Sequence, residues 1–239
     1  MPSVRVLGYN VRSLRDDPEA VARVIRALDP DVACLQEVPR FGDWWLRRRW
    51  LARACGMRVA AGRRACGLAV LAAPRVRRVA REFHLLTRVP GLHRRGLAVA
   101  VLEAGGARFA AASTHLDLRP EPRLAHVREV LRLLDRAADV HHAPVVLSGD
   151  VNEEPGGPSW TLLSADLRDA HAVAPAGEGA TFPARDPHRR IDGIFAAAPF
   201  GITGCGVPGD PALARDYPLA TDHRPVLADL TLPGETPPG

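Results

Sequence analysis

The stretch LSGDVNEEPGG (residues 147–157) starts at the end of an apolar run, 143–147, and continues directly into acidic side chains and one amide. The apolar run predicts a buried strand, and the Pro-Gly-Gly-Pro segment at 155–158 then interrupts the chain. Asp, Asn, Gly and Pro are also common in turns, because Asx side chains bond their own backbone and Gly and Pro set φ. The stretch alone therefore leaves two interpretations open, a simple turn or a functional site at a strand end.

The composition is that of an ordinary globular protein, with 239 residues, of which 46% are hydrophobic and 25% charged. This length is sufficient for one large α/β domain or for two small ones. No apolar run approaches the ~20 residues that a membrane span needs. The N-terminus also lacks the charged segment and long apolar segment of a signal peptide. We therefore expect a cytoplasmic protein without a transmembrane segment, and a monomer by default.

The formal charge of +5 and the pI of about 9.6 would fit a polyanionic partner such as nucleic acid. However, the chain contains no lysine, so that all 32 basic residues are arginine. A compositional bias of the whole sequence explains this pattern as well as selection for a polyanion does. Nucleic acid thus stays open as a partner, but the charge alone does not identify it.

The cysteines predict free thiols more than disulfides. None of them belongs to a C-x-x-C pair, and Cys34 lies inside an apolar run. Free cysteines are among the most buried residues and pack as small hydrophobic side chains. We therefore expect buried thiols, although a disulfide stays open, at Cys34, Cys55, Cys66 and Cys205.

Apolar runs and helix signals predict many strands with a few helices between them. Asp17 and Pro18 are typical of an N-cap and a first helical residue, and Gly105-Gly106 is typical of a hairpin turn. Strands are expected over 4–11, 32–35, 57–60, 67–72, 76–85, 96–103, 107–115, 144–149, 190–197, 202–207 and 225–232. Helices are expected over 17–28, 43–54, 122–138 and 157–164. This order predicts an α/β sandwich of two facing sheets with helices outside.

The helix expected over 43–54 carries both tryptophans and arginines. Because tryptophan buries a large area, we expect Trp44, Trp45 and Trp50 to pack in the core or at its rim. The cluster 47–49, three consecutive arginines, is interpreted as a solvated helix face, with contact to a phosphate as the alternative.

Polar side chains gather at the points where apolar runs stop. Each alone has an ordinary role in a turn, a cap or an ion pair. Together they are harder to explain in that way, because an ionised carboxylate is costly to bury without a partner or a metal. Carboxylate and amide oxygens beside imidazoles suit a hard cation such as Mg²⁺. The residues are Asn10, Glu37, His115, Asp117, Asp150, Asn152, Asp192, Asp222 and His223.

Six short motifs, in order along the chain, resemble those of the endonuclease/exonuclease/phosphatase superfamily. They are Gly8-Tyr9-Asn10-Val11, Leu35-Gln36-Glu37-Val38, Ser113-Thr114-His115-Leu116-Asp117, Ser148-Gly149-Asp150-Val151-Asn152, Arg190-Ile191-Asp192-Gly193-Ile194-Phe195 and Thr221-Asp222-His223-Arg224-Pro225-Val226. That superfamily includes pancreatic-type deoxyribonucleases, abasic-site endonucleases, neutral sphingomyelinases and inositol polyphosphate 5-phosphatases. Ser113 stands where relatives often carry Asn, and Thr221 stands where Ser is common; both positions keep a small polar side chain.

The resemblance implies a four-layer α/β sandwich, with two packed, mostly antiparallel sheets and helices on the outer faces. We expect one catalytic domain over 1–232. The Pro- and Gly-rich segment 233–239 is predicted to be a disordered tail.

The resemblance also implies roles for the polar residues. A Mg²⁺ ion, or Mn²⁺ in its place, would be held mainly by Glu37, with Asn10 and Asp222. Asp150 would orient and deprotonate the attacking water, and Asn152 would hold that water or a phosphate oxygen. The remaining roles are His223 on the phosphate, Asp192 orienting His223, His115 on the other side of the phosphate, and Arg12 and Arg123 as weaker candidates for substrate contact.

The predicted activity is hydrolysis of a phosphodiester by in-line attack of an activated water, with a nuclease as one form of it. A phosphomonoesterase and a sphingomyelinase-like phosphodiesterase acting on lipid headgroups stay open, because the shared motifs contact only phosphate and metal. A non-catalytic binding module is the third alternative. The short segment 11–16 leaves little room for the long recognition loops of DNA-repair relatives. Within the opening stretch, Glu153 and Glu154 are interpreted as rim charge.

Overall fold

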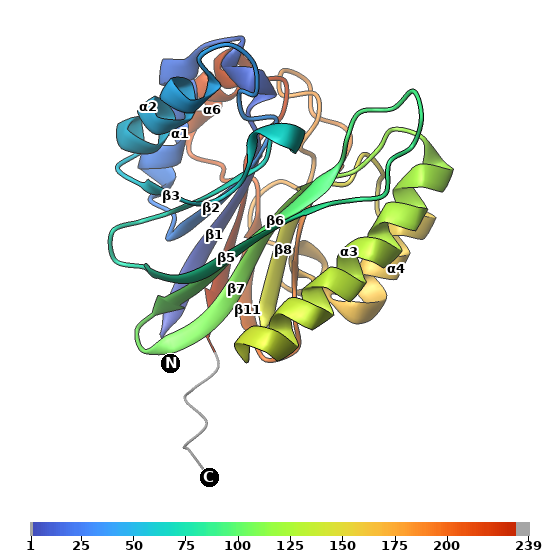
Figure 1. The fold of residues 1–239 in the computed structure, drawn as a ribbon. Helices are drawn as coiled ribbons and strands as arrows, with labels where there is room; N and C mark the ends of the chain where they lie inside the picture. The colour runs from blue at the N-terminus through green and yellow to red at the C-terminus, as the bar shows by residue number, and fades with distance from the viewer. Residues whose placement is uncertain (1, 233–239) are drawn as a thin grey trace.

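The computed structural model describes residues 2–232 as two six-stranded sheets that face each other, with helices outside both (Figure 1). In spatial order the first sheet contains β11 (Gly201–Gly206), β12 (Val226–Thr231), β1 (Ser3–Asn10), β2 (Val32–Gln36), β4 (Ala69–Ala72) and β3 (Arg58–Ala61). The second contains β5 (Arg77–Leu85), β6 (Gly96–Ala104), β7 (Ala107–His115), β8 (Val145–Asp150), β10 (Asp192–Ala196) and β9 (Arg168–Asp169).

The sheets are mostly antiparallel, and in each of them one pair of strands is parallel, β1 with β2 and β7 with β8. The four-layer α/β sandwich expected from the sequence is confirmed. The single domain over 1–232 stays a prediction, and the tail expected over 233–239 lies outside the described residues.

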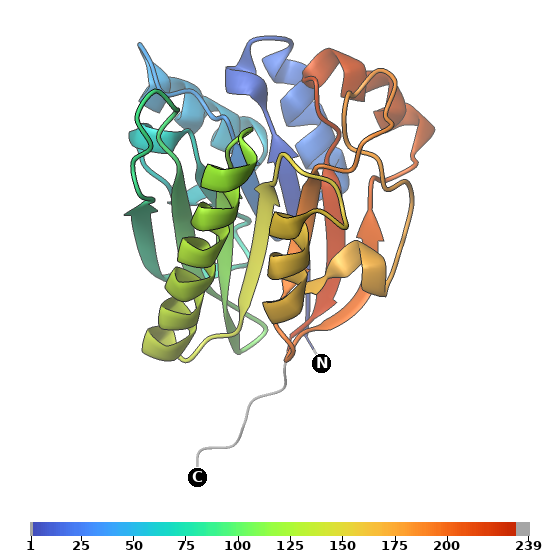
Figure 2. The ribbon, with the colours of Figure 1, turned by 90° about the vertical axis from the view of Figure 1, so that its right-hand side faces the viewer.

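Helices cover the outer face of each sheet. They are α1 (Pro18–Leu28), α2 (Trp44–Ala54) and α6 (Pro211–Ala220) on the first sheet, α3 (Pro120–His141) and α4 (Pro158–Asp166) on the second, and the short α5 (Ala170–Val173). Figure 2 shows α3 and α4 side by side against their sheet. The buried residues accordingly fall into three clusters, one between the sheets and one beneath each helical layer.

Local signals explain most helix starts. The side chain of Asp17 accepts a hydrogen bond from the Ala20 N–H, which caps α1, and Pro18 is its first residue. Asp210 and Pro211 repeat this arrangement at α6, which the sequence reading missed. Pro218 lies in the last turn of α6.

The expected packing of the α2 tryptophans is wrong for two of them. Trp45 and Trp50 are 49% and 39% exposed. Instead Arg48 is buried, and it donates hydrogen bonds to the carbonyls of Pro39 and Arg63. Burial lowers the pKa of Arg48 to about 10. The three arginines are therefore not one solvated face, because the helix turns the Arg48 side toward the protein.

Other expectations from the sequence hold. Gly105 and Gly106 both have positive φ and form the turn between β6 and β7. The cysteines are free and buried. Among residues 2–232, no helix combines the length and apolar character needed to cross a membrane. A cytoplasmic location and a monomeric state stay predictions.

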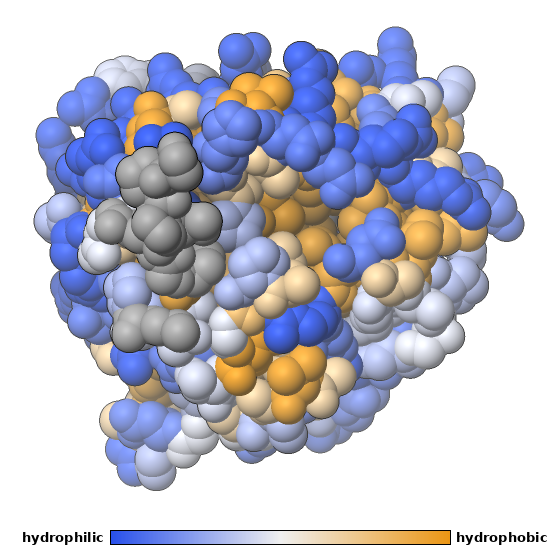
Figure 3. Space-filling view, turned by 90° about the horizontal axis from the view of Figure 1, so that it is seen from below, coloured by the Kyte–Doolittle hydropathy of each residue, from blue (hydrophilic) through white to orange (hydrophobic). Residues whose placement is uncertain are grey.

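Two features of the strands determine where the polar residues of the motifs lie. The parallel pairs bring the C-terminal ends of β1, β2, β7 and β8 to one edge of the sandwich, the upper edge in Figure 1. The sheets also come very close beside this edge, because a Cβ on Gly8 would lie 2.1 Å from Ser148 Oγ. Figure 3 shows the opposite end from below, with hydrophobic residues between hydrophilic ones.

Candidate active site

Strand register aligns three of the motif residues across the second sheet. His115 at the end of β7 pairs with Asp150 at the end of β8, and Asp150 pairs with Asp192 at the start of β10. In the first sheet Asn10 pairs with Gln36, which places Glu37 directly beyond it. The motifs that are far apart in the sequence therefore meet at one edge of the sandwich.

Asp150 lies at the centre of the cluster and is almost fully buried. One carboxylate oxygen accepts hydrogen bonds from Asn10 Nδ2 at 2.9 Å, and the other accepts one from the Asn152 N–H at 3.0 Å. His115 Nε2 and His223 Nε2 lie 3.4 and 3.8 Å from Asp150 Oδ2. Burial, with the nearby Asp192, raises the pKa of Asp150. The carboxylate is thus fixed in orientation and more basic than a solvated aspartate.

His223 is held by Asp192. The imidazole Nδ1 lies 2.9 Å from Asp192 Oδ2, and the ring of Phe182 packs against it with centroids 5.0 Å apart. Burial opposes a charge on this ring, but Asp192, helped by Asp150, outweighs it and raises the pKa of His223 to about 10. His223 is therefore protonated at neutral pH.

His115 is in the opposite state. Burial, with the charge of Arg95, outweighs the attraction of Asp150 and lowers the pKa of His115 to about 3. Asn152 Nδ2 donates to His115 Nε2 at 3.1 Å, so that the ring proton lies on Nδ1. That nitrogen is 3.9 Å from Glu37 Oε1. Two histidines thus flank Asp150, one neutral and one charged.

Glu37 forms the open side of the cluster, beside the buried Asn10. Asn10 Nδ2 lies 3.3 Å from Glu37 Oε1, and the Glu37 side chain is 39% exposed. Glu37 has φ of +51°, a left-handed conformation that is uncommon for residues other than glycine. Asn152 shares this feature, with φ of +56°. Such backbone strain is often found at functional sites.

The cluster opens into a cavity of about 370 Å³, lined by Glu37, His115, Asp150, Asn152 and His223 and by basic residues of neighbouring loops. Five of the residues predicted from the motifs therefore share one cavity. Their arrangement, with a buried carboxylate between a neutral and a charged imidazole, can activate water beside an anionic group.

The model of the Endonuclease/Exonuclease/phosphatase family matches residues 7–223. The chain belongs to this family. Members of the family are hydrolases that act on phosphoesters and depend on a divalent metal, so the chain is a phosphoric ester hydrolase. No curated protein sequence matches it.

Solved structures of the family share the fold. An endonuclease/exonuclease/phosphatase from Bacteroides vulgatus is 20% identical, with a TM-score of 0.79, over 97% of this chain and 100% of that chain. The mannosyl-6-phosphatase of Bacteroides thetaiotaomicron is 18% identical, with a TM-score of 0.82, over 96% and 100%. TDP2 of D. rerio, solved with a single-stranded DNA product, is 16% identical, with a TM-score of 0.75, over 97% and 100%.

Two arrangements of the described residues have the donor atoms for a divalent cation. The Glu37 carboxylate presents oxygen ligands to the cavity, as hard cations require. Asn10 is buried, its Nδ2 donates to Glu37 and Asp150, and its Oδ1 accepts from the Arg12 N–H. Asp150, Asp192 and His223 also offer one atom each within 4.8 Å of one another. However, His223 and Asp192 are buried and already bonded to each other. The Glu37 carboxylate, which is open to the cavity, therefore suits a Mg²⁺-like ion better, and Asn10 would join it once its amide turns its oxygen toward the ion.

Asp222 is placed differently from the other expected metal ligands. Its carboxylate lies 3.2 Å from Arg12 Nε and accepts a hydrogen bond from Thr221 Oγ1. Arg12 also bonds Asp16 and is 44% exposed, so it stays available to a substrate. To bind a cation beside Glu37, the Asp222 carboxylate would have to leave its pair with Arg12.

The structure does not support substrate contact by Arg123. This side chain is buried, and its guanidinium donates to the carbonyls of Asp117, Leu118 and Asn152. It also forms an ion pair with Glu153, 2.7 Å between Nη2 and Oε1. Arg123 thus positions the loops that carry the site. Glu153 is correspondingly not rim charge, whereas Glu154 is half exposed beside Arg189.

Two residues beside the site, Thr181 and Ser113, have no role that the sequence indicates. Thr181 Oγ1 accepts hydrogen bonds from the N–H groups of Ile191 and Asp192. These bonds fix the start of β10, where Asp192 contacts His223. Ser113 Oγ donates to the Leu35 carbonyl in the opposite sheet and accepts from Gln36 Nε2. No local pattern marks either contact, because each joins segments that are distant in the sequence.

Proposed function

We propose that this chain is a Mg²⁺-dependent phosphodiesterase that hydrolyses its substrate by in-line attack of an activated water. The observation that carries the proposal is the buried Asp150 carboxylate between a neutral His115 and a charged His223, at the floor of a cavity. A general base and a fixed positive charge are the groups that a phosphoryl transfer needs on either side of the phosphorus.

Asp150 acts as the base in this proposal. Its raised pKa favours proton transfer from water, since a general base works best when its pKa lies nearer the working pH. Its hydrogen bonds with Asn10 and the Asn152 backbone hold one orientation of the carboxylate. The Asn152 side chain, beside His115, holds the water or a phosphate oxygen.

His223 acts on the phosphate. Because Asp192 keeps the imidazole protonated, Nε2 presents a positive charge and a proton to a phosphate oxygen. His115 meets the phosphate from the other side as a neutral hydrogen-bonding group. Arg12, paired with Asp222, is the nearby arginine that we propose for substrate contact.

Glu37 would hold the metal, joined by Asn10 if its amide turns its oxygen toward the ion and by Asp222 if it leaves Arg12. The divalent ion would supply positive charge beside the phosphate oxygens. Oxygen ligands favour Mg²⁺, and Mn²⁺ is expected to replace it because it accepts the same ligand types.

The test is hydrolysis of bis(p-nitrophenyl) phosphate and nicking of supercoiled plasmid, with Mg²⁺ and with EDTA. Asp150→Asn keeps the size of the side chain and should lower kcat by about 10²–10³, as the loss of one such group does in other hydrolases. Asp186→Asn, at an exposed position, is the control and should keep full activity. Circular dichroism checks that both variants fold.

The outcomes separate the alternatives. Nicking that EDTA and Asp150→Asn both abolish would support a nuclease. Turnover of p-nitrophenyl phosphate alone would contradict the diester proposal and favour a phosphomonoesterase, and turnover of phosphocholine lipids alone would favour a lipid-headgroup phosphodiesterase. An Asp150→Asn variant as active as the wild type would contradict the role of the site.

A further inference from the structure

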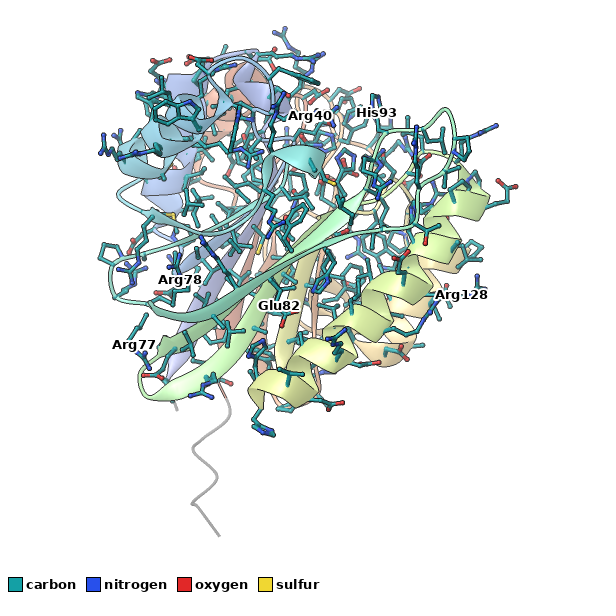
Figure 4. The ribbon with its side chains drawn as sticks, in the orientation of Figure 1. Arg40, Arg77, Arg78, Glu82, His93 and Arg128 are labelled. Carbon is teal, nitrogen blue, oxygen red and sulfur yellow. The ribbon has the colours of Figure 1, made fainter. Side chains whose placement is uncertain are left out.

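Basic side chains line the cavity beside the candidate catalytic residues. They come from three separate segments, namely the loop after the first strand, the segment between β2 and α2, and the loop between β5 and β6. The residues are Arg15, Arg40, His93, Arg94 and Arg95. Figure 4 shows Arg40 and His93 near each other at the upper end of the molecule, while the labelled Arg77 and Arg128 lie well away from them.

Arg95 is the most informative of these residues. It is 9% exposed, and among residues 2–232 its Nε has no hydrogen-bond partner. It forms an ion pair with the buried Asp117, with Nε 3.5 Å from Oδ2, but the contact is not a hydrogen bond. A buried donor without a partner costs free energy that a bound acceptor would recover. Nε itself is covered, but the side chain lines the cavity, and among residues 2–232 Nη1 and Nη2 make no hydrogen bond, so that they can donate to a ligand there.

Arg40 and Arg94 extend the site toward the solvent. Among the described residues, neither forms an ion pair with a carboxylate, and Arg94 is exposed. The Arg40 guanidinium lies over the ring of Phe41, 5.3 Å from its centroid, which holds it at the rim of the cavity. Guanidinium groups bind phosphate through paired N–H groups, so three of them around one space match a phosphate well.

The scissile phosphate already has enough partners. His115, Asn152 and His223 face it in the proposed function, together with the ion at Glu37. Arg94 and Arg95 line the cavity from the loop between β5 and β6, which carries none of these groups, and Arg40 lines it three residues after Glu37. They are therefore in excess of what one phosphate requires.

We propose that Arg40, Arg94 and Arg95 form a second anion site, which binds a non-scissile phosphate of the substrate. The substrate would accordingly carry two phosphate groups, one at Asp150 and His223 and one at the arginines. This inference rests on the proposed function, because it takes the scissile phosphate to lie beside Asp150. The second phosphate could belong to a nucleic acid strand or to a small bisphosphate, which share this chemistry.

The catalytic test compares two esters that differ by one phosphate, thymidine 5′-(p-nitrophenyl phosphate) with and without a 3′-phosphate. The wild type should prefer the 3′-phosphorylated ester by about 10- to 100-fold in kcat/KM, the effect of a hydrogen bond between charged groups. Arg94→Ala and Arg95→Lys should each reduce this preference about 10-fold. Arg128→Ala, the matched charge change on α3, should keep it. Equal preference in wild type and Arg94→Ala would overturn the proposal.

A binding test works without catalysis. In EDTA, inorganic pyrophosphate should raise the Tm of the wild type more than inorganic phosphate does, because binding to the native state stabilises it. Arg94→Ala and Arg95→Lys should lose the difference, and Arg128→Ala should retain it. If neither ester is hydrolysed but pyrophosphate binding depends on Arg94, the diester function fails and the anion site stands. If Arg128→Ala loses the effect equally, binding to a generally basic surface explains it and the site is refuted.

Competition identifies the source of the second phosphate. Oligothymidylate and fructose 1,6-bisphosphate are compared as inhibitors of the wild type and of Arg94→Ala. Stronger inhibition by oligothymidylate, lost in Arg94→Ala, indicates a nucleic acid strand, and the reverse order indicates a small bisphosphate. Inhibition by both that is unchanged in Arg94→Ala would contradict the second site.

Discussion

Replacing Glu153 by glutamine should destabilise the protein far more than the same change at the adjacent Glu154. Only about a tenth of the Glu153 side chain is exposed. Its carboxylate accepts hydrogen bonds from Arg123 Nε and Nη2 at 3.2 and 2.7 Å. The other oxygen accepts from the N–H groups of Ser159 and Trp160, at 2.6 and 2.9 Å, in the first turn of α4. One carboxylate therefore joins the loop after β8 to two helices.

The expected loss of stability in Glu153→Gln follows from these contacts. Glutamine keeps one acceptor oxygen, but its amide nitrogen would face N–H donors, and the buried Arg123 charge would lose its only carboxylate partner among the described residues. Removing one partner of a buried ion pair typically costs ~3–5 kcal/mol, and we expect about 3 kcal/mol here because Arg123 keeps its carbonyl acceptors. Glu154 and Arg189 are 50% and 42% exposed, so that Glu154→Gln should cost ~0–1 kcal/mol.

Urea unfolding followed by circular dichroism at pH 7 measures the difference, as a lower midpoint with an unchanged m value for Glu153→Gln. The pH dependence gives a second check. Burial of Glu153 is outweighed by the hydrogen bonds from Trp160 and Arg123, which lower its pKa. Glu153 therefore contributes its full stabilisation above the pKa of an unfolded glutamate, ~4.3. This stabilisation is lost as the pH falls through the lower pKa of Glu153 in the folded protein. Equal midpoints for the two variants at pH 7 would refute the role of Glu153.

Two further variants test the close approach of the sheets and the state of the site. Gly8→Ala should cost ~1–3 kcal/mol in urea unfolding because its Cβ would meet Ser148 Oγ. Ser148→Ala should remove most of that cost in the double variant, whereas Gly209→Ala, in open space, should be nearly neutral. In metal-free protein, Asp192→Asn should lower the pKa of His223 from about 10, because Asp192 is the main cause of the raised value. The imidazole titration followed by NMR measures this change. An unchanged titration would contradict the pairing.

The elements of the fold could be predicted from the sequence where local signals agree with the tertiary structure. Asp17 and Pro18 mark the start of α1 correctly, and Gly105-Gly106 marks the hairpin. No helix is predicted over 211–220, although Asp210 and Pro211 begin α6 in the same way as Asp17 and Pro18 begin α1. Local propensity is thus reliable at caps and turns, and less so where tertiary packing decides.

The candidate site could be predicted as a set of residue types but not as a set of contacts. The motifs distinguish Asp150 and Asn152 from turn residues, whereas Glu153, one residue further along, is predicted from the sequence to be rim charge. Its burial depends on Arg123, thirty positions earlier, and on the start of α4. Similarly, nothing in the segment around Arg95 indicates that its guanidinium is buried without a hydrogen-bond partner at Nε.

The two histidines show most clearly what the structure reveals beyond the sequence. Both follow or precede apolar strands, and the sequence offers no reason to give them different charges. The strand register pairs Asp192 on β10 with Asp150 on β8, and His223 bonds this Asp192. His115 instead accepts a hydrogen bond from the side-chain amide of Asn152. One ring is therefore charged and the other neutral within a few ångströms of the same carboxylate. This difference makes the cluster suitable for phosphoryl chemistry, because two charged rings would suppress the basicity of Asp150 and two neutral rings would remove a positive charge that faces the phosphate.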